Sequence, residues 1–305
     1  MDFEINDNQS AVLQGLDQLI GALNVEPSQQ GVFSAFSSVL DEELRNGGYL
    51  RIACEEGFSL LDAALVVERI ARLPVSAEVA SSALVAPLLE EQDGPLALST
   101  SIEAPSRFLP QARVLLVDVG DEVLSIDVDG GNVEHVETLF AYPYGRLRQT
   151  NDLEIRSLGP SLVAPLRRRW RLAIAVEGAG LMQAAVDHVV EHVKTRHQFG
   201  RPLGSFQAIQ HRLAMAASTA AAARWLGLNA AYSDSETDCA TAAAYVQDAI
   251  PRLTYDLHQF CGAMGLTLEF NLHYWTYRLK GLLGELGGSS KQARAAALNA
   301  WKQTG

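Results

Sequence analysis

The hydrophobic period of the chain changes twice, and this change limits the folds that the sequence can adopt. In residues 1–95 apolar side chains recur at the spacing of one face of an α-helix. Between residues 96 and 160 they alternate with a period of two, which is typical of β-strands. The helical period returns after Pro165 and holds to the end of the sequence. This order predicts a mainly α fold with a small β region in its middle.

The N-terminal region is expected to contain helices with recognisable starts. Asn6, Asp7 or Asn8 can cap the first, and Ser59 and Asp62 stand near the start of the second, which covers residues 59–73. An alanine-rich third helix is predicted over residues 76–89. These elements indicate an N-terminal helical domain over residues 1–95.

The middle region predicts a small antiparallel β domain over residues 96–160. Residues 112–119, 122–128 and 132–139 alternate as strands do, and residues 148–158 predict one more. The Asp-Gly-Gly-Asn sequence at 129–132 is a hairpin signal between the second and third of these strands. A region of this size is too small to hold a deep pocket by itself.

Long helical patterns follow and predict a four-helix bundle over residues 161–305. The helices are expected at residues 168–198, 205–233, 238–265 and 269–286, with Pro251 kinking or breaking the third. Alanine is frequent at their expected contact faces, which allows the helices to approach closely.

Composition excludes several classes of protein. The net charge of −12 argues against a nucleic-acid partner, which needs a basic face. The three cysteines, Cys54, Cys239 and Cys261, lack zinc spacing and predict reduced thiols in a cytoplasmic protein. The acidic N-terminal segment does not resemble a signal peptide, and no apolar run is long enough to predict a membrane span.

Three segments resemble the acyl-CoA dehydrogenase family. The sequence RHQFG at 196–200, followed by Phe206-Gln207, is similar to that family's signature. Residues 258–288 resemble its Gln-x-x-Gly-x-x-Gly region and the helix after it, and residues 55–74 resemble its N-terminal segment. The order of helical region, β region and bundle also matches the family, so the resemblance covers nearly the whole chain.

The resemblance implies FAD bound across a subunit interface, with one subunit holding the flavin ring and the other the pyrophosphate and adenosine. The residues that match the role of holding the pyrophosphate and adenosine have suitable chemistry: a planar charged guanidinium, an aromatic face, side-chain amides and a glycine that lets the backbone approach a ligand. Ala263 departs mildly from the glycine that the family often has there. The cofactor-binding residues implied in this way are Arg196, Gln198, Phe199, Phe206, Gln207, Gln259, Gly262 and Ala263. Taken singly, Arg196 could merely cap a helix and Phe199 could be a core residue; the combined spacing favours the cofactor role.

The catalytic base of the family is missing from both of its usual positions. In the family a Glu removes the α proton of an acyl-CoA and the flavin takes the β hydride. Ungapped counting places Leu286 and Trp170 at the two positions, and neither can accept a proton. Glu285, one residue away, is the remaining candidate, and its alternative role is a solvent-facing charge at a helix end. Glu177 is more simply explained as an interhelical polar contact.

The middle region also departs from the family pattern. Residues 96–160 contain no Trp and no Gly- or Ser-rich loop of the kind that holds a flavin ring. The chain therefore matches the family in the half-site that serves a neighbour's FAD, and not in the half-site for its own.

Two further motifs have simpler explanations than chemistry. His188-Val-Val-Glu-His192 matches an inverted zinc-peptidase string, but no third ligand segment is evident, so no metal is expected. The basic residues Arg167, Arg168, Arg169 and Arg171 are interpreted as a solvated helix start or a ridge that faces a partner.

Three hypotheses follow from these observations. The first is a subunit of a heteromeric FAD-dependent acyl-CoA dehydrogenase whose longer partner subunit supplies the base. Some bacterial family members that act on steroid side-chain CoA esters are built this way, as α2β2 heterotetramers, and the shortness of this chain resembles them. Such an enzyme takes an acyl-CoA substrate and passes electrons to an electron-transfer flavoprotein or a similar acceptor, without a membrane partner. The alternatives are a self-sufficient dehydrogenase using Glu285 and a cofactor-free structural relative.

Overall fold

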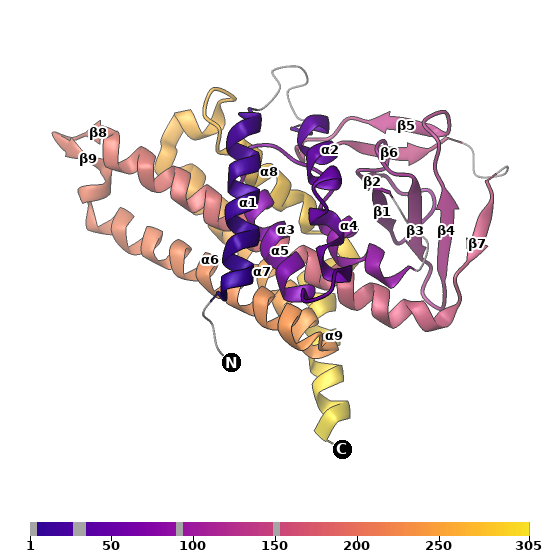
Figure 1. Cartoon of the computed structure of the whole chain (residues 1–305). Coiled ribbons are helices and arrows are strands. Elements are labelled where there is room, and N and C mark those ends of the chain that lie inside the picture. The colour runs from indigo at the N-terminus through magenta and orange to yellow at the C-terminus, as the bar shows by residue number, and fades with distance from the viewer. Residues whose placement is uncertain (1–4, 27–34, 90–93, 149–152, 305) are drawn as a thin grey trace.

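The computed structural model describes residues 5–26, 35–89, 94–148 and 153–304 (Figure 1). Helices occupy both ends of the sequence and the strands lie between them, so the expected mainly α class with a small β region is confirmed. In Figure 1 the sheets lie at one end of the molecule, and the β8–β9 hairpin lies at the opposite end.

The N-terminal helices begin where the sequence predicts caps. Asn6 and Gln9 form a capping box at the first helix, and Ser59 and Asp62 form one at α3. The third predicted helix is only the five-residue α4 followed by a 3₁₀ turn that contains Pro87. The elements are α1 (Asp7–Leu23), α2 (Ser38–Asn46), η1 (Tyr49–Cys54), α3 (Leu60–Ala71), α4 (Ala80–Leu84) and η2 (Ala86–Leu88).

The strands form two sheets in the middle of the sequence. The first has the order β1 (Leu96–Ser99), β3 (Val114–Asp118), β4 (Val123–Asp127) and β7 (Ile155–Ser157). The second has the order β2 (Ser106–Arg107), β6 (Tyr144–Leu147) and β5 (Val133–Val136).

Two details of the predicted β region are wrong. The β1–β3 pair is parallel, so the region is not purely antiparallel. The turn at 129–132 exists, with Asp129 accepting from the Gly131 amide, but it does not close a hairpin. The strands on either side of it belong to different sheets, because both edges of β4 are already hydrogen-bonded to β3 and β7.

The C-terminal helices pack around α5, which in turn packs against α6, α7 and α8. Helix α7 continues through Pro251. The predicted fourth helix, expected at residues 269–286, covers only His273–Leu282. The chain turns at Leu286–Gly288, where all three φ angles are positive, and a further helix, α9, follows. The elements are η3 (Pro160–Leu162), α5 (Val163–Thr195), β8 (His197–Gln198), β9 (Arg201–Pro202), η4 (Leu203–Ser205), α6 (Gln207–Ser233), α7 (Glu236–Cys261), η5 (Gly262–Leu266), α8 (His273–Leu282), η6 (Glu285–Gly287) and α9 (Gly288–Thr304).

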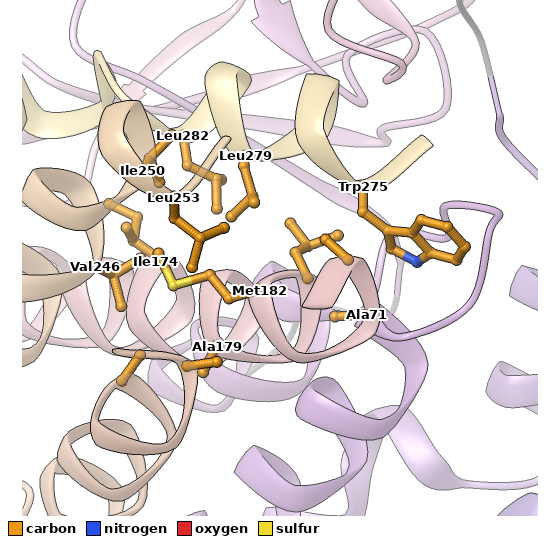
Figure 2. Packing of buried hydrophobic residues seen from close by; sticks show 14 of the residues in the cluster. Ala71, Ile174, Ala179, Met182, Val246, Ile250, Leu253, Trp275, Leu279 and Leu282 are labelled. Atoms are coloured by element: carbon orange, nitrogen blue, oxygen red, sulfur yellow. The ribbon is translucent and has the colours of Figure 1, made fainter. Parts of the chain in front are cut away.

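The core of the bundle lies between α5, α7 and α8. Figure 2 shows Met182 of α5 directed toward Leu253 of α7, with Leu279 of α8 nearby, and all three side chains are buried. Helix α3 approaches α5 at Gly180, where a Cβ would collide with the carbonyl oxygen of Glu68. The N-terminal helices and the bundle therefore share buried surface, and the three-part division of the chain stays a prediction.

Candidate functional site

The RHQFG segment forms a tight hairpin at the end of the bundle. Strands β8 and β9 pair His197 with Pro202 and Gln198 with Arg201, which leaves Phe199 and Gly200 as a two-residue turn. Their φ angles are +54° and +79°, as a type I′ turn requires. A left-handed conformation is costly for a phenylalanine, on the order of 1 kcal/mol, and such strain is concentrated at functional sites.

Phe199 is not a core residue. Its side chain is 87% exposed at the hairpin tip, and its ring meets the Phe206 ring edge-on at a centroid distance of 6.1 Å. Arg201 lies over the other aromatic ring, 4.0 Å from the Phe206 centroid. The hairpin thus holds an unburied aromatic side chain in a fixed place, which indicates a contact surface.

A cavity of about 620 Å³ lies beside this hairpin, between the ends of α5 and α7 and the start of α6. It brings together six of the eight residues implied as cofactor-binding: Arg196, Gln198, Phe199, Gln259, Gly262 and Ala263. The other two adjoin it: Phe206 through its contact with Phe199, and Gln207 as the exposed first residue of α6. We call this cavity the hairpin cleft.

Arg196 does not use its side chain to cap α5. Its backbone N–H donates to the His192 carbonyl oxygen at 2.9 Å, while no hydrogen bond from its guanidinium is found among the described residues. The cationic fork is therefore available to an anion in the cleft. Arg196 also helps to lower the pKa of His192, although burial contributes more to that shift.

The opposite wall of the cleft depends on a glycine at the end of α7. Gly262 has φ +58° and ψ −141°, a conformation open essentially to glycine alone. An added Cβ there would meet no atom within 4 Å, so the backbone conformation, rather than lack of space, requires glycine. This turn exposes Gly262 and Ala263 at the cleft, as a close backbone approach to a ligand requires.

A second and larger cavity, of about 960 Å³, shares Gln259 and Gly262 with the hairpin cleft. It lies between α7 and α8, which supply most of the residues that line it. Besides Gln259 and Gly262, these lining residues include Phe140, Thr254, Tyr255, His258, Tyr277 and Lys280.

Trp170, which stands at one of the two expected base positions, contacts Glu285, the neighbour of Leu286 at the other. The Trp170 indole nitrogen donates to Glu285 Oε2 at 2.6 Å, which joins α5 to the turn after α8. Arg107 of β2 pairs with Glu285 Oε1 at 2.5 Å and with Glu177 Oε2 at 2.7 Å. The Tyr142 hydroxyl donates to Glu177 Oε1 at 2.7 Å. We call these five residues the Arg107 cluster.

Every carboxylate oxygen in the Arg107 cluster has a partner. The side chains of Arg107 and Glu177 are each 8% exposed, and that of Glu285 is 13% exposed. Burial raises the pKa of Glu285, even though Arg107 and Trp170 favour its charged form. To accept a substrate proton, Glu285 would have to give up its ion pair with Arg107 or its bond from Trp170, which argues against a role as general base.

The structure corrects two alternatives from the sequence. Glu285 is not a solvent-facing charge but a buried ion-pair partner. Glu177 makes no interhelical contact of the expected kind, because its partners are Arg107 of β2 and Tyr142, neither of which lies on a helix. It lies two helical turns from Trp170 on the same face of α5. The seven-residue spacing was a usable signal, whereas nothing in the sequence pointed to Arg107 or Tyr142.

The other two motifs serve the fold. Arg167 pairs with Asp118 at 2.5 Å, and Arg168 and Arg169 both pair with Asp234, so the basic residues are not a free ridge. The His188 and His192 rings pack against Phe270, tilted and edge-on respectively, at centroid distances of 4.5 and 4.9 Å. No cluster of metal-ligating side chains is found in the part of the chain that the structure describes.

No helix among the described residues is both long and apolar enough to cross a membrane.

This chain is similar to known proteins in both sequence and architecture. Residues 168–296 match the family model of the acyl-CoA dehydrogenase C-terminal domain. The acyl-CoA dehydrogenase IpdE2 of Mycobacterium tuberculosis is 26% identical over 81% of this chain and 80% of the relative.

Two solved structures have the same fold over nearly their whole length. A chain of the ChsE4–ChsE5 complex from Mycobacterium tuberculosis superposes with a TM-score of 0.80 at 20% identity, covering 99% of both chains. A variant of the steroid ACAD (acyl-CoA dehydrogenase) Tcur3481–Tcur3483 superposes with a TM-score of 0.77 at 21% identity, again over 99% of both chains. Residues 168–296 therefore correspond to the C-terminal domain of the acyl-CoA dehydrogenase family, and the described chain has the fold of these two structural neighbours.

Proposed function

We propose that this chain is the non-catalytic subunit of a heteromeric FAD-dependent acyl-CoA dehydrogenase. It contributes pyrophosphate and adenosine contacts to an FAD whose ring and catalytic Glu belong to a longer partner subunit. The observation that carries the proposal is the contrast between its two regions: the hairpin cleft is open, and the Arg107 cluster is closed.

The donor set of the hairpin cleft fits one end of FAD. Arg196 would pair with the pyrophosphate, and Gln198 and Gln259 would hydrogen-bond to the phosphate or ribose oxygens. The exposed ring of Phe199 would pack on the cofactor, and the Gly262 turn would let the backbone approach. Bound FAD supplies the two-electron acceptor for α,β-desaturation of an acyl-CoA.

The open face of the cleft suits completion by another chain. Phe199 and Leu266 are 87% and 79% exposed, and Met264 and Tyr255 add further apolar surface beside them. Several exposed large apolar side chains near a cavity are typical of a protein interface. An α2β2 assembly with the longer subunit would bury it.

The Arg107 cluster supports the division of labour. It contains Trp170, at one of the two family base positions, and Glu285, the neighbour of the other, and both of its acids have partners within the cluster. A self-sufficient enzyme would need Glu285 to leave Arg107 and Trp170 before it could accept a proton. A cofactor-free relative would have no use for the Arg196 side chain, for which the described residues provide no hydrogen-bond partner beside the cleft.

The names of two relatives suggest the wider setting. One structural neighbour is a steroid ACAD, and another is a chain from a complex of two different proteins. We therefore include a steroid side-chain CoA ester among the proposed substrates, and steroid degradation as the proposed setting. An electron-transfer flavoprotein or a similar acceptor would reoxidise the flavin.

Co-expression tests the proposal. The chain would be purified alone and together with the longer acyl-CoA dehydrogenase encoded by a neighbouring gene, and the flavin absorbance of each would be recorded. The complex is expected to be yellow with one FAD per pair of unlike subunits. Tight, stoichiometric FAD in a homomer of this chain would refute the proposal.

A further inference from the structure

His258, near the end of α7, connects three segments around the two cavities. Its Nδ1 lies 2.6 Å from the Gly265 carbonyl oxygen in η5, and its Nε2 lies 2.9 Å from Thr276 Oγ1 on α8. A carbonyl can only accept, so Nδ1 carries a proton, and in the neutral ring Nε2 accepts from the Thr276 hydroxyl. Thr276 is fully buried, and its hydroxyl lies farther, 3.2 Å, from its other acceptor, the Leu272 carbonyl.

The turn that His258 holds is the one that forms a wall of the hairpin cleft. Gly262 begins η5 and Gly265 lies inside it. A Cβ on Gly265 would lie 2.8 Å from Cys261 Cβ and 3.1 Å from the His258 carbonyl oxygen, so the turn is folded tightly back on α7. The His258 ring is the side-chain link that fixes this folded-back turn to its surroundings.

Helix α8, to which His258 also bonds, is itself anchored. The Trp275 indole nitrogen donates to the Arg72 carbonyl at 2.9 Å. The buried Arg278 donates to the Val75 carbonyl at 2.8 Å and to two further carbonyls in the same segment after α3. The bond from His258 to Thr276 therefore connects η5 to α8, which these contacts hold rigidly in the fold.

We propose that His258 is a positioning residue for the cofactor, which holds the Gly262–Leu266 turn between α7 and α8 so that Gly262 and Ala263 face the hairpin cleft. The inference rests on the FAD role proposed above. His258 is not a residue that touches the cofactor, because it lines the larger cavity and not the hairpin cleft. Its effect on affinity passes through the backbone of the turn.

Two substitutions separate this role from simple packing. His258→Phe keeps a ring of similar shape and removes both hydrogen bonds; FAD affinity of the complex, from titration of the flavin-free form, is expected to fall about tenfold or more. His258→Asn places an amide donor near the position of Nδ1 and is expected to recover most of that loss. Amide hydrogen exchange of residues 262–266 should rise in the Phe variant and return toward normal in the Asn variant.

His273→Phe is the matched control. His273 is a buried histidine on α8 whose Nδ1 lies 3.0 Å from the Phe270 carbonyl oxygen, and it lines neither cavity. Its replacement should lower thermal stability as His258→Phe does, and leave FAD affinity within about twofold.

The outcomes separate this inference from the proposed function. Unchanged exchange in the turn and unchanged FAD affinity in His258→Phe would overturn the positioning role. Equal losses of affinity in both Phe variants would reduce it to general destabilisation. If the wild-type complex binds no FAD while His258→Phe still frees the turn, the turn is positioned by His258 but the proposed FAD function is wrong.

Discussion

Replacing Glu285 by Gln tests whether this residue is a catalytic base or part of a closed structural cluster. The carboxylate accepts from Trp170 through Oε2 and pairs with Arg107 through Oε1. A glutamine has only one acceptor oxygen, so its amide NH₂ must face either the indole N–H or the guanidinium, and both of these are donors.

The cost in stability follows from this geometry. Loss of a hydrogen-bonded contact to a charged group costs about 1.5–3 kcal/mol, and no larger cost is expected because Arg107 stays compensated by Glu177. For a chain of this size a loss of about 1.5–3 kcal/mol lowers Tm by several degrees. Glu285→Gln is therefore not a neutral change for stability, although the two side chains are nearly isosteric.

The substitution is expected to lower stability but not to abolish activity. The assembled complex should keep its FAD and its dehydrogenase rate within a few fold, because the partner supplies the base in the proposed enzyme. Loss of a general base normally costs on the order of a hundredfold or more. The measurements are Tm by thermal denaturation and the rate per bound FAD, taken well below Tm.

Glu134→Gln provides the control. The ion pair of Glu134 with Arg146 is exposed, with 44% and 52% of the two side chains accessible. The substitution should therefore leave Tm unchanged within error. If Glu285→Gln keeps FAD and assembly but loses activity a hundredfold, Glu285 is the base, and the chain is a catalytic subunit. If its Tm matches that of Glu134→Gln, the account of the Arg107 cluster is wrong.

Three further predictions follow from the structure. The isolated chain should be colourless and tend to aggregate, because the apolar surface around the hairpin cleft is then uncovered; absorbance at flavin wavelengths and light scattering check this. Arg196→Ala should weaken FAD retention by the complex about tenfold or more, since a charge-assisted contact is worth about 1.5–3 kcal/mol; unchanged flavin content would leave Arg196 as a helix-end residue only. Stability should fall as pH drops below about 6.5, because burial lowers the pKa of His188, His258 and His273, so the unfolded chain binds more protons there. The loss should approach about 1.4 kcal/mol per pH unit for each histidine, and a pH-independent urea midpoint between pH 7.5 and 5.5 would contradict it.

Local signals made much of the fold predictable from sequence. The capping boxes at Asn6 and Ser59 each join residues three positions apart. The two-residue turn at Phe199–Gly200 is also local, because it is defined by the backbone angles of these two residues. Motif spacing also selected Arg196 and Gln259, which the fold brings to one cavity. Strand partners were less predictable, because the choice of β3 and β7 by β4 depends on competition between strands that are distant in sequence.

The sequence by itself determined the order of helical and strand regions, the caps of α1 and α3, which residues match the family's cofactor motif, and that no acid stands at either base position. Only the tertiary structure decided what Glu285 and Glu177 do. Their shared partner, Arg107, lies 178 residues before Glu285 and 70 residues before Glu177. It stands in a β-strand whose position no helical periodicity can predict. Whether a carboxylate is a free base or half of a buried ion pair depends on burial and on the charges beside it, and both arise only when distant segments pack together.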